Sequence, residues 1–309
     1  MGLFSRKKAA TLVLSPDRPV RATETVTATV TMDEALDKVT SARVELVYVN
    51  GFRYRWAGRA DAAFSQGNDS ILMMGQVGTD YGSEKHTTEW VHVLDEPLTV
   101  SDGILGSGSY QVALRLPSWS PGSSKEVVQW QARLHVDRQG KDVEVSAPIS
   151  VLIAAPEPAP SSTELPLVQG ERAIANSLDF DIVTERSCYR PGDEVRGVVG
   201  VTSREIVTRT ALLAVWFQRW QESHPVDKTP GGATDAYTRP MVNIAKNVML
   251  VAGQRSEFLF ALRLPADVDP TTEAVHSSID WFVQIKVEFS GATGAIERAK
   301  RGIIVYTAN

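Results

Sequence analysis

The sequence predicts an all-β protein made of two tandem β-sandwich domains that are joined by a Pro-rich linker. Short segments with alternating apolar and polar residues recur along the chain, helical periodicity is scarce, and several strand patterns occur twice. Alternation with period two is typical of strands that bury one face, and short strands separated by turn residues are typical of sandwiches. With 309 residues, the chain is long enough for two domains that each have a core.

The first repeated pattern is a turn followed by a strand. Pro191 and Gly192 suit the two central positions of a type II turn, because the second position needs a positive φ. Four residues of the next strand are expected to point inward: Val195, Gly197, Val199 and Val201. At an offset of 169 (195 − 26), an earlier segment has Val26, Ala28, Val30 and Met32 in the same places. Two copies of one strand pattern predict two copies of one domain.

Further segments follow in the same order in both halves. Residues 42–49, with Glu45 on the polar face of the expected strand, match residues 210–217 at an offset of about 168. The sequence Ala-Leu-Arg-Leu-Pro occurs at 113–117 and again at 261–265, at an offset of 148 (265 − 117). A strand that begins with Trp130 or Trp281 follows it in each copy. Because the offset falls by about 20 between these matches, the first copy is longer, and the extra length lies within residues 50–90.

These matches set the expected domain boundaries. We predict a basic leader at residues 1–10, a first sandwich over 11–155, a linker at 156–171 and a second sandwich over 172–309. Alternating prolines favour an extended connector, and the linker is expected to contain no folded element. Residues 33–38 suit one turn of helix.

Composition narrows the class of protein. Hydrophobic residues make up 43% and charged residues 22%, as in ordinary soluble proteins. A net charge of −5 and a pI near 5.6 argue against a nucleic-acid partner. A single cysteine, Cys188, excludes an intrachain disulfide and is expected to be a small apolar residue, which favours a cytoplasmic location. The leader, where Leu3 and Phe4 precede three basic residues, would touch an anionic membrane weakly, or it is a solvated tail.

Several of these segments resemble a known family. Residues 189–199, Tyr-Arg-Pro-Gly-Asp-Glu-Val-Arg-Gly-Val-Val, resemble the strand that opens the second domain of arrestin-like proteins, whose pattern is Tyr-x-Pro-Gly-(Asp/Glu)-x-Val-x-Gly. The Phe-x-Leu-x-Leu-Pro strand, the Ser/Thr/Pro turn and the Trp-led strand within 258–287 resemble that family too. The chain is most similar to its bacterial sporulation-control branch, although Ala22 and Thr23 replace Pro-Gly in the first copy. The resemblance implies two arrestin-like (immunoglobulin-like) sandwiches that act as adaptors without catalysis.

No set of residues predicts catalysis, a cofactor or a metal site. The sequence has no nucleophile elbow, Walker loop or dinucleotide fingerprint. The five histidines, among them His92 and His135 on polar strand faces, form no zinc template and are expected at solvated positions. Asp179 and Asp181 are expected on one face of a solvated strand edge.

Two aromatic and basic clusters are candidate contacts with a partner protein. Both follow the equivalent strand and end in an Arg-Trp pair, Arg55 with Trp56 and Arg219 with Trp220. Arg and Trp dominate interface hot spots, although some of these rings are needed to fill the cores.

The leading hypothesis is a non-catalytic adaptor or scaffold that binds protein partners through loops and an inter-domain groove, in stress or developmental regulation of the sporulation type. The alternative is a β-sandwich module that binds a glycan or small molecule. An enzyme with a site on the 50–90 loop and a homodimer joined through sheet edges are further alternatives.

Overall fold

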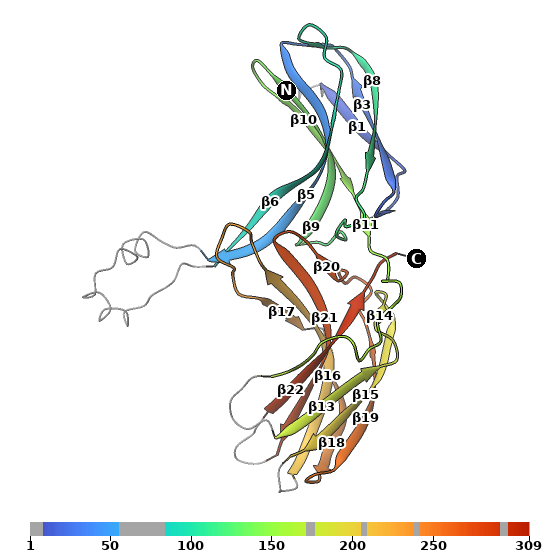
Figure 1. The fold of residues 1–309 in the computed structure, drawn as a ribbon, viewed down its shortest axis with the longest axis vertical. Helices are drawn as coiled ribbons and strands as arrows, with labels where there is room; N and C mark the ends of the chain where they lie inside the picture. The colour runs from blue at the N-terminus through green and yellow to red at the C-terminus, as the bar shows by residue number, and fades with distance from the viewer. Residues whose placement is uncertain are drawn as a thin grey trace, which may run out of the picture. The chain divides into compact units, whose positions relative to one another are not determined.

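The computed structural model describes residues 9–55, 84–170, 177–204, 209–237, 241–290 and 296–308. Regular structure among these residues consists of strands, so the all-β fold class is confirmed (Figure 1). The chain divides into two compact units. Unit 1 comprises Met1–Ile153, Ser223–Gly232 and Glu273–Ser277, and unit 2 comprises Ala154–Glu222, Ala233–Thr272 and Ser278–Asn309. Two short segments that the sequence assigns to the second sandwich therefore belong to unit 1.

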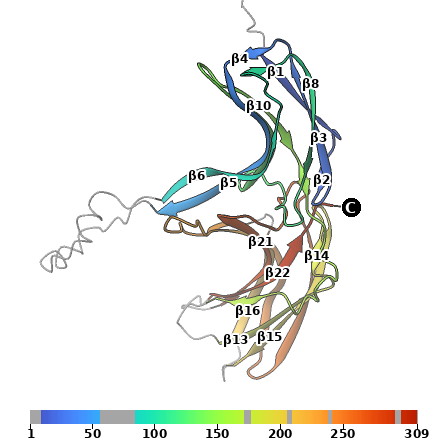
Figure 2. The ribbon, with the colours of Figure 1, turned by 45° about the horizontal axis from the view of Figure 1, so that its top comes forward.

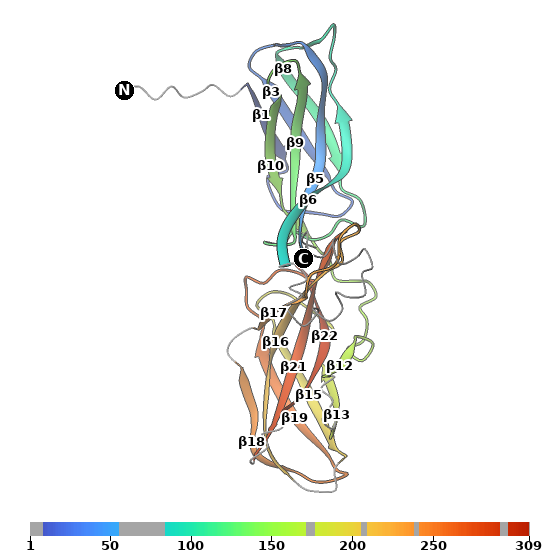
Figure 3. The same cartoon turned by 90° about the vertical axis from the view of Figure 1, so that its left-hand side faces the viewer.

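Unit 1 is a sandwich of a three-stranded and a four-stranded sheet. The smaller sheet has the order β1 (Ala10–Ser15), β3 (Thr25–Met32), β8 (Gly108–Arg115). The larger has the order β10 (Val143–Ile149), β9 (Val128–Arg138), β5 (Val39–Arg55), β6 (Glu84–Pro97) (Figure 3). Two short pairs complete the unit, β2 (Val20–Arg21) with β11 (Val151–Leu152) and β4 (Leu36–Asp37) with β7 (Ile104–Leu105). The helical turn predicted at 33–38 is wrong, because Leu36 and Asp37 pair as a strand.

Unit 2 repeats this plan. Its smaller sheet has the order β13 (Leu178–Thr184), β15 (Glu194–Ser203), β19 (Arg255–Arg263). The larger sheet has the order β12 (Leu167–Gln169), β22 (Ile296–Val305), β21 (Ser277–Phe289), β16 (Arg209–Ser223), β17 (Thr234–Tyr237). Three further strands join it, with β18 (Val242–Leu250) on β16, β14 (Cys188–Tyr189) on β22 and β20 (Thr272–Glu273) on β21.

The predicted inward residues form the cores. On β15, Val195, Val199 and Val201 are fully buried, and their counterparts on β3, Val26, Ala28, Val30 and Met32, are buried as well. Trp130 on β9 and Trp281 on β21 make equivalent hydrogen bonds. Trp130 Nε1 donates to the carbonyl of Pro121 at 2.8 Å, and Trp281 Nε1 donates to the carbonyl of Asp269 at 3.0 Å. The two units are therefore copies in hydrogen bonding as well as in strand order.

The predicted turn before β15 is present. Asp193 N donates to Arg190 O at 3.0 Å, and Gly192 has a φ of 86°. The same turn precedes β3, where Glu24 N donates to Arg21 O at 3.2 Å. There, Thr23 occupies the place of Gly192 with a φ of 71°. Positive φ is unfavourable for a β-branched residue, so unit 1 keeps the turn at an energetic cost.

The expectation that the linker contains no folded element is wrong. Leu167–Gln169 form β12, which pairs with β22 at the edge of the larger sheet of unit 2. Buried Arg301 on β22 joins the residues before β12 to β13, since its guanidinium donates to the carbonyls of Leu165 at 2.6 Å and Ile182 at 2.8 Å. Prolines remove backbone donors but leave carbonyl oxygens, which are the acceptors that a buried guanidinium needs.

The two segments that join unit 1 from later in the chain are held by β5, the segment Glu273–Ser277 through Asn50 and the segment Ser223–Gly232 through Arg55. The Asn50 side chain is fully buried and donates to the carbonyl of Val127 and to Ser277 Oγ, both at 2.9 Å. Its Oδ1 accepts the backbone N–H of His276 at 2.7 Å. Further along β5, Arg55 N donates to Thr229 O at 3.0 Å. The two later segments therefore bond to β5 at and after Asn50, where its pairing with β9 ends.

Candidate functional site

An apolar row crosses the outward face of the smaller sheet of unit 2. Val183 on β13 pairs with Val198 on β15, which pairs with Leu259 on β19. The inward residues of β15 have odd numbers, so Val198 points away from the core. Leu259 is 79% exposed and Val183 is 36% exposed, whereas Val198 between them is half-buried. Three apolar side chains therefore form a continuous exposed strip.

Charged pairs lie on both sides of the strip. Towards one end of the strands, Arg255 on β19 pairs with Asp181 at 2.9 Å and with Glu257 at 3.0 Å. Towards the other end, Arg196 pairs with Glu194 at 2.6 Å. An apolar centre with a polar rim is the common arrangement of a protein–protein interface.

The same positions in unit 1 are mostly polar. Ala28 and Gly197 are equivalent, so Thr29 corresponds to Val198 and its partners Val13 and Gln111 correspond to Val183 and Leu259. Since this row in unit 1 contains Thr29 and Gln111, the fold does not require apolar residues there. A sequence signal existed, because Val198 and Leu259 each interrupt an alternating strand with an apolar residue at a polar position.

The predicted pair Arg219 and Trp220 lies on β16, and both side chains contact other residues of unit 2. Arg219 pairs with Asp269 at 3.3 Å, and the side chains of both residues are largely buried, with exposures of 12% and 14%. Trp220 is half-buried, and the ammonium of Lys300 lies 3.9 Å from the centre of its ring. The same ammonium lies 4.2 Å from the ring of Phe282. These contacts give both predicted residues a structural role.

The other predicted pair is only partly described. Arg55 ends β5 with an exposed side chain, and its backbone bonds to Thr229. Trp56 lies outside the described residues, and so do residues 1–8 of the predicted leader. The interface role of Arg55 and Trp56 stays a prediction.

A charged network lies on the outward face of the larger sheet of unit 1, whose strands β5 and β6 bend strongly (Figure 2). Asp137 on β9 accepts hydrogen bonds from Ser41 at 2.5 Å and from His135 at 2.7 Å, and Arg43 pairs with it at 3.0 Å. The bonds from Ser41 and His135 lower the pKa of Asp137 to about 2. Arg43 also pairs with Glu45 at 2.7 Å. His135 is therefore part of this network, and the simple solvated position expected for it is wrong.

Glu45 differs from its expected place on a solvated strand face. It is 1% exposed, and its Oε2 has no hydrogen-bond partner within the described ranges. The alternation of a single strand does not reveal this burial.

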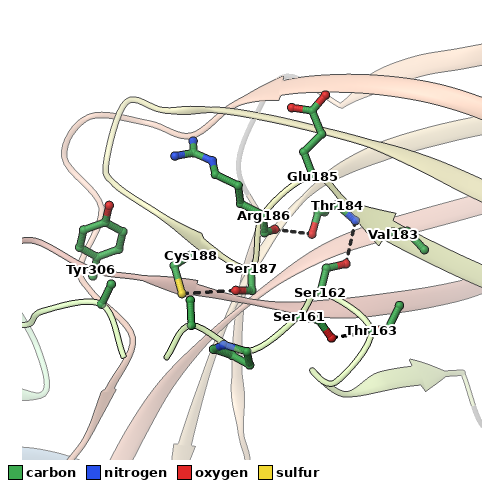
Figure 4. Close-up of a pocket in the computed structure, with 13 residues that line it drawn as sticks. Ser161, Ser162, Thr163, Val183, Thr184, Glu185, Arg186, Ser187, Cys188 and Tyr306 are labelled. Carbon is green, nitrogen blue, oxygen red and sulfur yellow. Dashed lines mark hydrogen bonds between the residues drawn. The ribbon is translucent and has the colours of Figure 1, made fainter. Parts of the chain in front are cut away.

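A shallow cavity of about 580 Å³ lies in unit 2 between the linker and the turn after β13 (Figure 4). Its hydroxyl groups are used in local structure. Ser162 Oγ accepts the N–H of Thr184 at 2.9 Å, and Thr184 Oγ1 donates to the carbonyl of Arg186 at 2.6 Å. Cys188 at its wall is buried, and its Sγ lies 3.4 Å from Ser187 Oγ, as expected for a small core residue. The cavity thus joins the linker to unit 2, and it does not favour the ligand-binding alternative.

Comparisons with known proteins give little further information. No family model matches the chain, and no curated protein matches it. Among solved structures, the chain is similar to Spo0M, a sporulation control protein from Bacillus subtilis, with 18% sequence identity and a TM-score of 0.34. The matched region covers 44% of this chain and 51%, about half, of that chain. A similarity this weak carries no argument, and the arrestin-like resemblance stays a prediction.

The part of the chain that the structure describes contains no helix with the length and apolar character needed to span a membrane.

Proposed function

We propose that this chain is a non-catalytic adaptor and that it binds a partner protein through the apolar row of unit 2. The observation that carries the proposal is the contrast between two equivalent rows, Val183–Val198–Leu259 in unit 2 and Val13–Thr29–Gln111 in unit 1. Exposed apolar strips with a charged rim are typical of interaction surfaces. The resemblance to the sporulation-control branch supports developmental or stress regulation as the setting.

The expected contribution of the row follows from its exposure. Burying a Leu side chain that is 79% exposed contributes about 1.5–3 kcal/mol to binding, because apolar surface leaves water. About 1.4 kcal/mol corresponds to a tenfold change in affinity. Loss of Leu259 should therefore weaken a complex about tenfold or more.

The chain itself supplies the variants for a test. Val198→Thr with Leu259→Gln installs the residues that unit 1 has at Thr29 and Gln111, so a stable sandwich is expected. Tagged full-length protein is used to recover partners from its own cells, and each recovered partner is then purified and its affinity is measured directly. We expect binding about tenfold weaker or worse for the double variant and unchanged thermal unfolding.

Val13→Thr in unit 1 is the matched control, since it removes an apolar side chain that is 61% exposed from the equivalent row. It should bind the partner like the wild type. Equal affinity of the double variant and the wild type would contradict the proposal. A second result would also contradict it. If light scattering showed a dimer for the wild type and a monomer for the double variant, the row would bind a second copy of the chain.

A further inference from the structure

Three side chains with metal-binding atoms converge on the outward face of the larger sheet of unit 1. Glu45 extends from β5, and His92 and Asp95 extend from β6. One ligand atom from each lies within 4.8 Å of the other two. We propose that these three residues bind a divalent transition-metal ion, for which Zn²⁺ fits best.

A β-bulge creates this arrangement. Glu45 pairs with Asp95 and Leu46 pairs with Leu94, but the next residue, Val47, pairs with His92, so the register shifts by one residue. Residues three apart on a regular strand point to opposite faces. The extra residue of the bulge brings His92 and Asp95 to the same face, beside Glu45. Bulges often lie next to functional sites, where they redirect a side chain in this way.

The state of Glu45 points to a missing cation. Its Oε1 accepts a hydrogen bond from Arg43 Nε at 2.7 Å, while Oε2 is buried and has no hydrogen-bond partner among the described residues. A buried carboxylate oxygen without a partner is costly, and metal coordination is one of the ways in which proteins compensate a buried charge. Because Oε1 is occupied by Arg43, Oε2 is the oxygen left for a metal.

The second unit shows that the fold does not need an acid at this position. At the offset of about 168 that relates the two strands, unit 2 has Leu213 and Ala214, and both are fully buried. A buried apolar residue therefore suffices for packing. Glu45 is retained in unit 1 together with His92 and Asp95, which supports a role beyond packing.

The charge balance favours a cation as well. Arg43 divides its single positive charge between Glu45 and Asp137. Asp95 adds another carboxylate, and neither its side chain nor that of His92 makes a hydrogen bond or ion pair in the described part of the chain. Two exposed ligands beside one buried ligand leave the site accessible from solvent.

The donor set indicates the kind of metal. Imidazole suits Zn²⁺ and its neighbours in the first transition row, whereas Mg²⁺ and Ca²⁺ prefer sites made of oxygen alone. Zinc commonly takes three protein ligands and a water molecule, at 2.0–2.2 Å for nitrogen and oxygen. Tetrahedral bonds of that length place ligand atoms about 3.3 Å apart. The present separations, within 4.8 Å, need to shorten by about 1.5 Å at most, and the two exposed side chains are free of side-chain hydrogen bonds within the described residues.

The test uses the full-length protein after treatment with a chelator. Calorimetric titration with Zn²⁺ should show one ion bound per chain and a raised melting temperature, because a ligand that binds only the folded state stabilises it. Titration with Mg²⁺ or Ca²⁺ should show at least about tenfold weaker binding. If the protein bound Mg²⁺ or Ca²⁺ as tightly as Zn²⁺, the assignment of a transition metal would be overturned.

Variants locate the ion. His92→Ala and Asp95→Asn change exposed residues and should fold normally, and each should weaken Zn²⁺ binding at least about tenfold, as expected when a ligand is lost. Glu45→Gln should do the same but changes a buried residue, so the two exposed variants decide the result. His86→Ala, on the same strand with an exposed side chain, is the control and should bind Zn²⁺ like the wild type. Wild-type binding by both exposed variants, or no Zn²⁺ binding by the wild type, would overturn the proposal.

Discussion

The two units have the same plan but protect the edge of the larger sheet in different ways. Trp130 pairs with Ile149 and Trp281 pairs with Ile303, so Pro148 and Gly302 occupy equivalent positions on β10 and β22. In unit 2, Gly302 N donates to the carbonyl of Pro166 in the linker at 2.9 Å.

In unit 1, Pro148 has no N–H to offer at this position, and proline at an edge discourages pairing with another strand. The contrast shows that a duplicated strand can end a sheet by removing a donor or by pairing with the connector. The linker is thus a structural part of unit 2.

The cores differ in a second pair of positions, where the largest effect is expected. Ala28 faces Val112 across the smaller sheet of unit 1, whereas Gly197 faces Phe260 in unit 2. A Cβ atom at Gly197 would lie 2.3 Å from the carbonyl oxygen of Val183 and 2.7 Å from Phe260 Cζ. The larger ring in unit 2 therefore depends on the smaller residue opposite it.

We predict that Gly197→Leu destabilises the protein by about 3 kcal/mol or more, the upper end for overpacking, because a backbone carbonyl must move. Gly197→Ala should cost about 1–3 kcal/mol, and adding Phe260→Val, which copies Val112, should restore part of this loss. Urea denaturation of the full chain measures both. If Gly197→Leu had the same midpoint of urea denaturation as the wild type, the close approach of Val183 and Phe260 to this glycine would be refuted.

Arg301 allows a test of the connector, with a smaller expected effect. Ala147 is its equivalent in unit 1, since Ala147 pairs with Ala132 just as Arg301 pairs with Val283. Arg301→Ala would leave the carbonyls of Ile182 and Leu165 without their donor, and we expect a loss of about 2 kcal/mol.

Hydrogen exchange should then increase at residues 163–170, where the linker pairs with β22, and limited proteolysis should cut there first. The same measurement on Arg298→Ala provides a control, because the side chain of Arg298 lies on the same strand and makes no hydrogen bond to the linker within the described residues. If Arg301→Ala and the wild type showed the same hydrogen exchange at residues 163–170, the strand pairing alone would hold the linker.

The sequence was sufficient for the features that repeat locally. Alternation identified the inward residues of β15 and β3, and a proline followed by glycine identified a turn whose second residue has positive φ. The resemblance between Ala113–Pro117 and Ala261–Pro265 located equivalent strands.

Features that depend on distant contacts were not predictable. Glu45 is buried beside a register shift in the pairing of β5 with β6, and neither the burial nor the shift appears in the alternation of β5. Asn50 bonds to Ser277, 227 residues further along the chain, so no local pattern assigns that segment to unit 1. Arg219 has a partner in Asp269, which also has no signature in sequence.

The shared turn gives the smallest and most direct comparison of the two units. In both, the residue with positive φ donates its N–H to the residue that directly follows the last strand of the smaller sheet: Thr23 to Leu116 O at 3.1 Å and Gly192 to Leu264 O at 3.0 Å. A left-handed conformation costs a non-glycine residue roughly 1–2 kcal/mol, but glycine also loses more entropy on folding, by about 0.5–1 kcal/mol. The net preference for glycine at this position should be about 0.5–1 kcal/mol.

We therefore predict opposite effects for reciprocal exchanges. Thr23→Gly should stabilise unit 1 by about 0.5–1 kcal/mol, and Gly192→Thr should destabilise unit 2 by a similar amount. The effects should appear as slower hydrogen exchange in β2–β3 for the first variant and faster exchange in β14–β15 for the second, with the other unit unchanged in each case. Thr25→Gly is a control, because Thr25 lies on β3 in extended backbone and its replacement should destabilise unit 1. If Thr23→Gly behaved like Thr25→Gly, the left-handed conformation of Thr23 would carry no strain, and the two turns would be energetically equivalent despite their different residues.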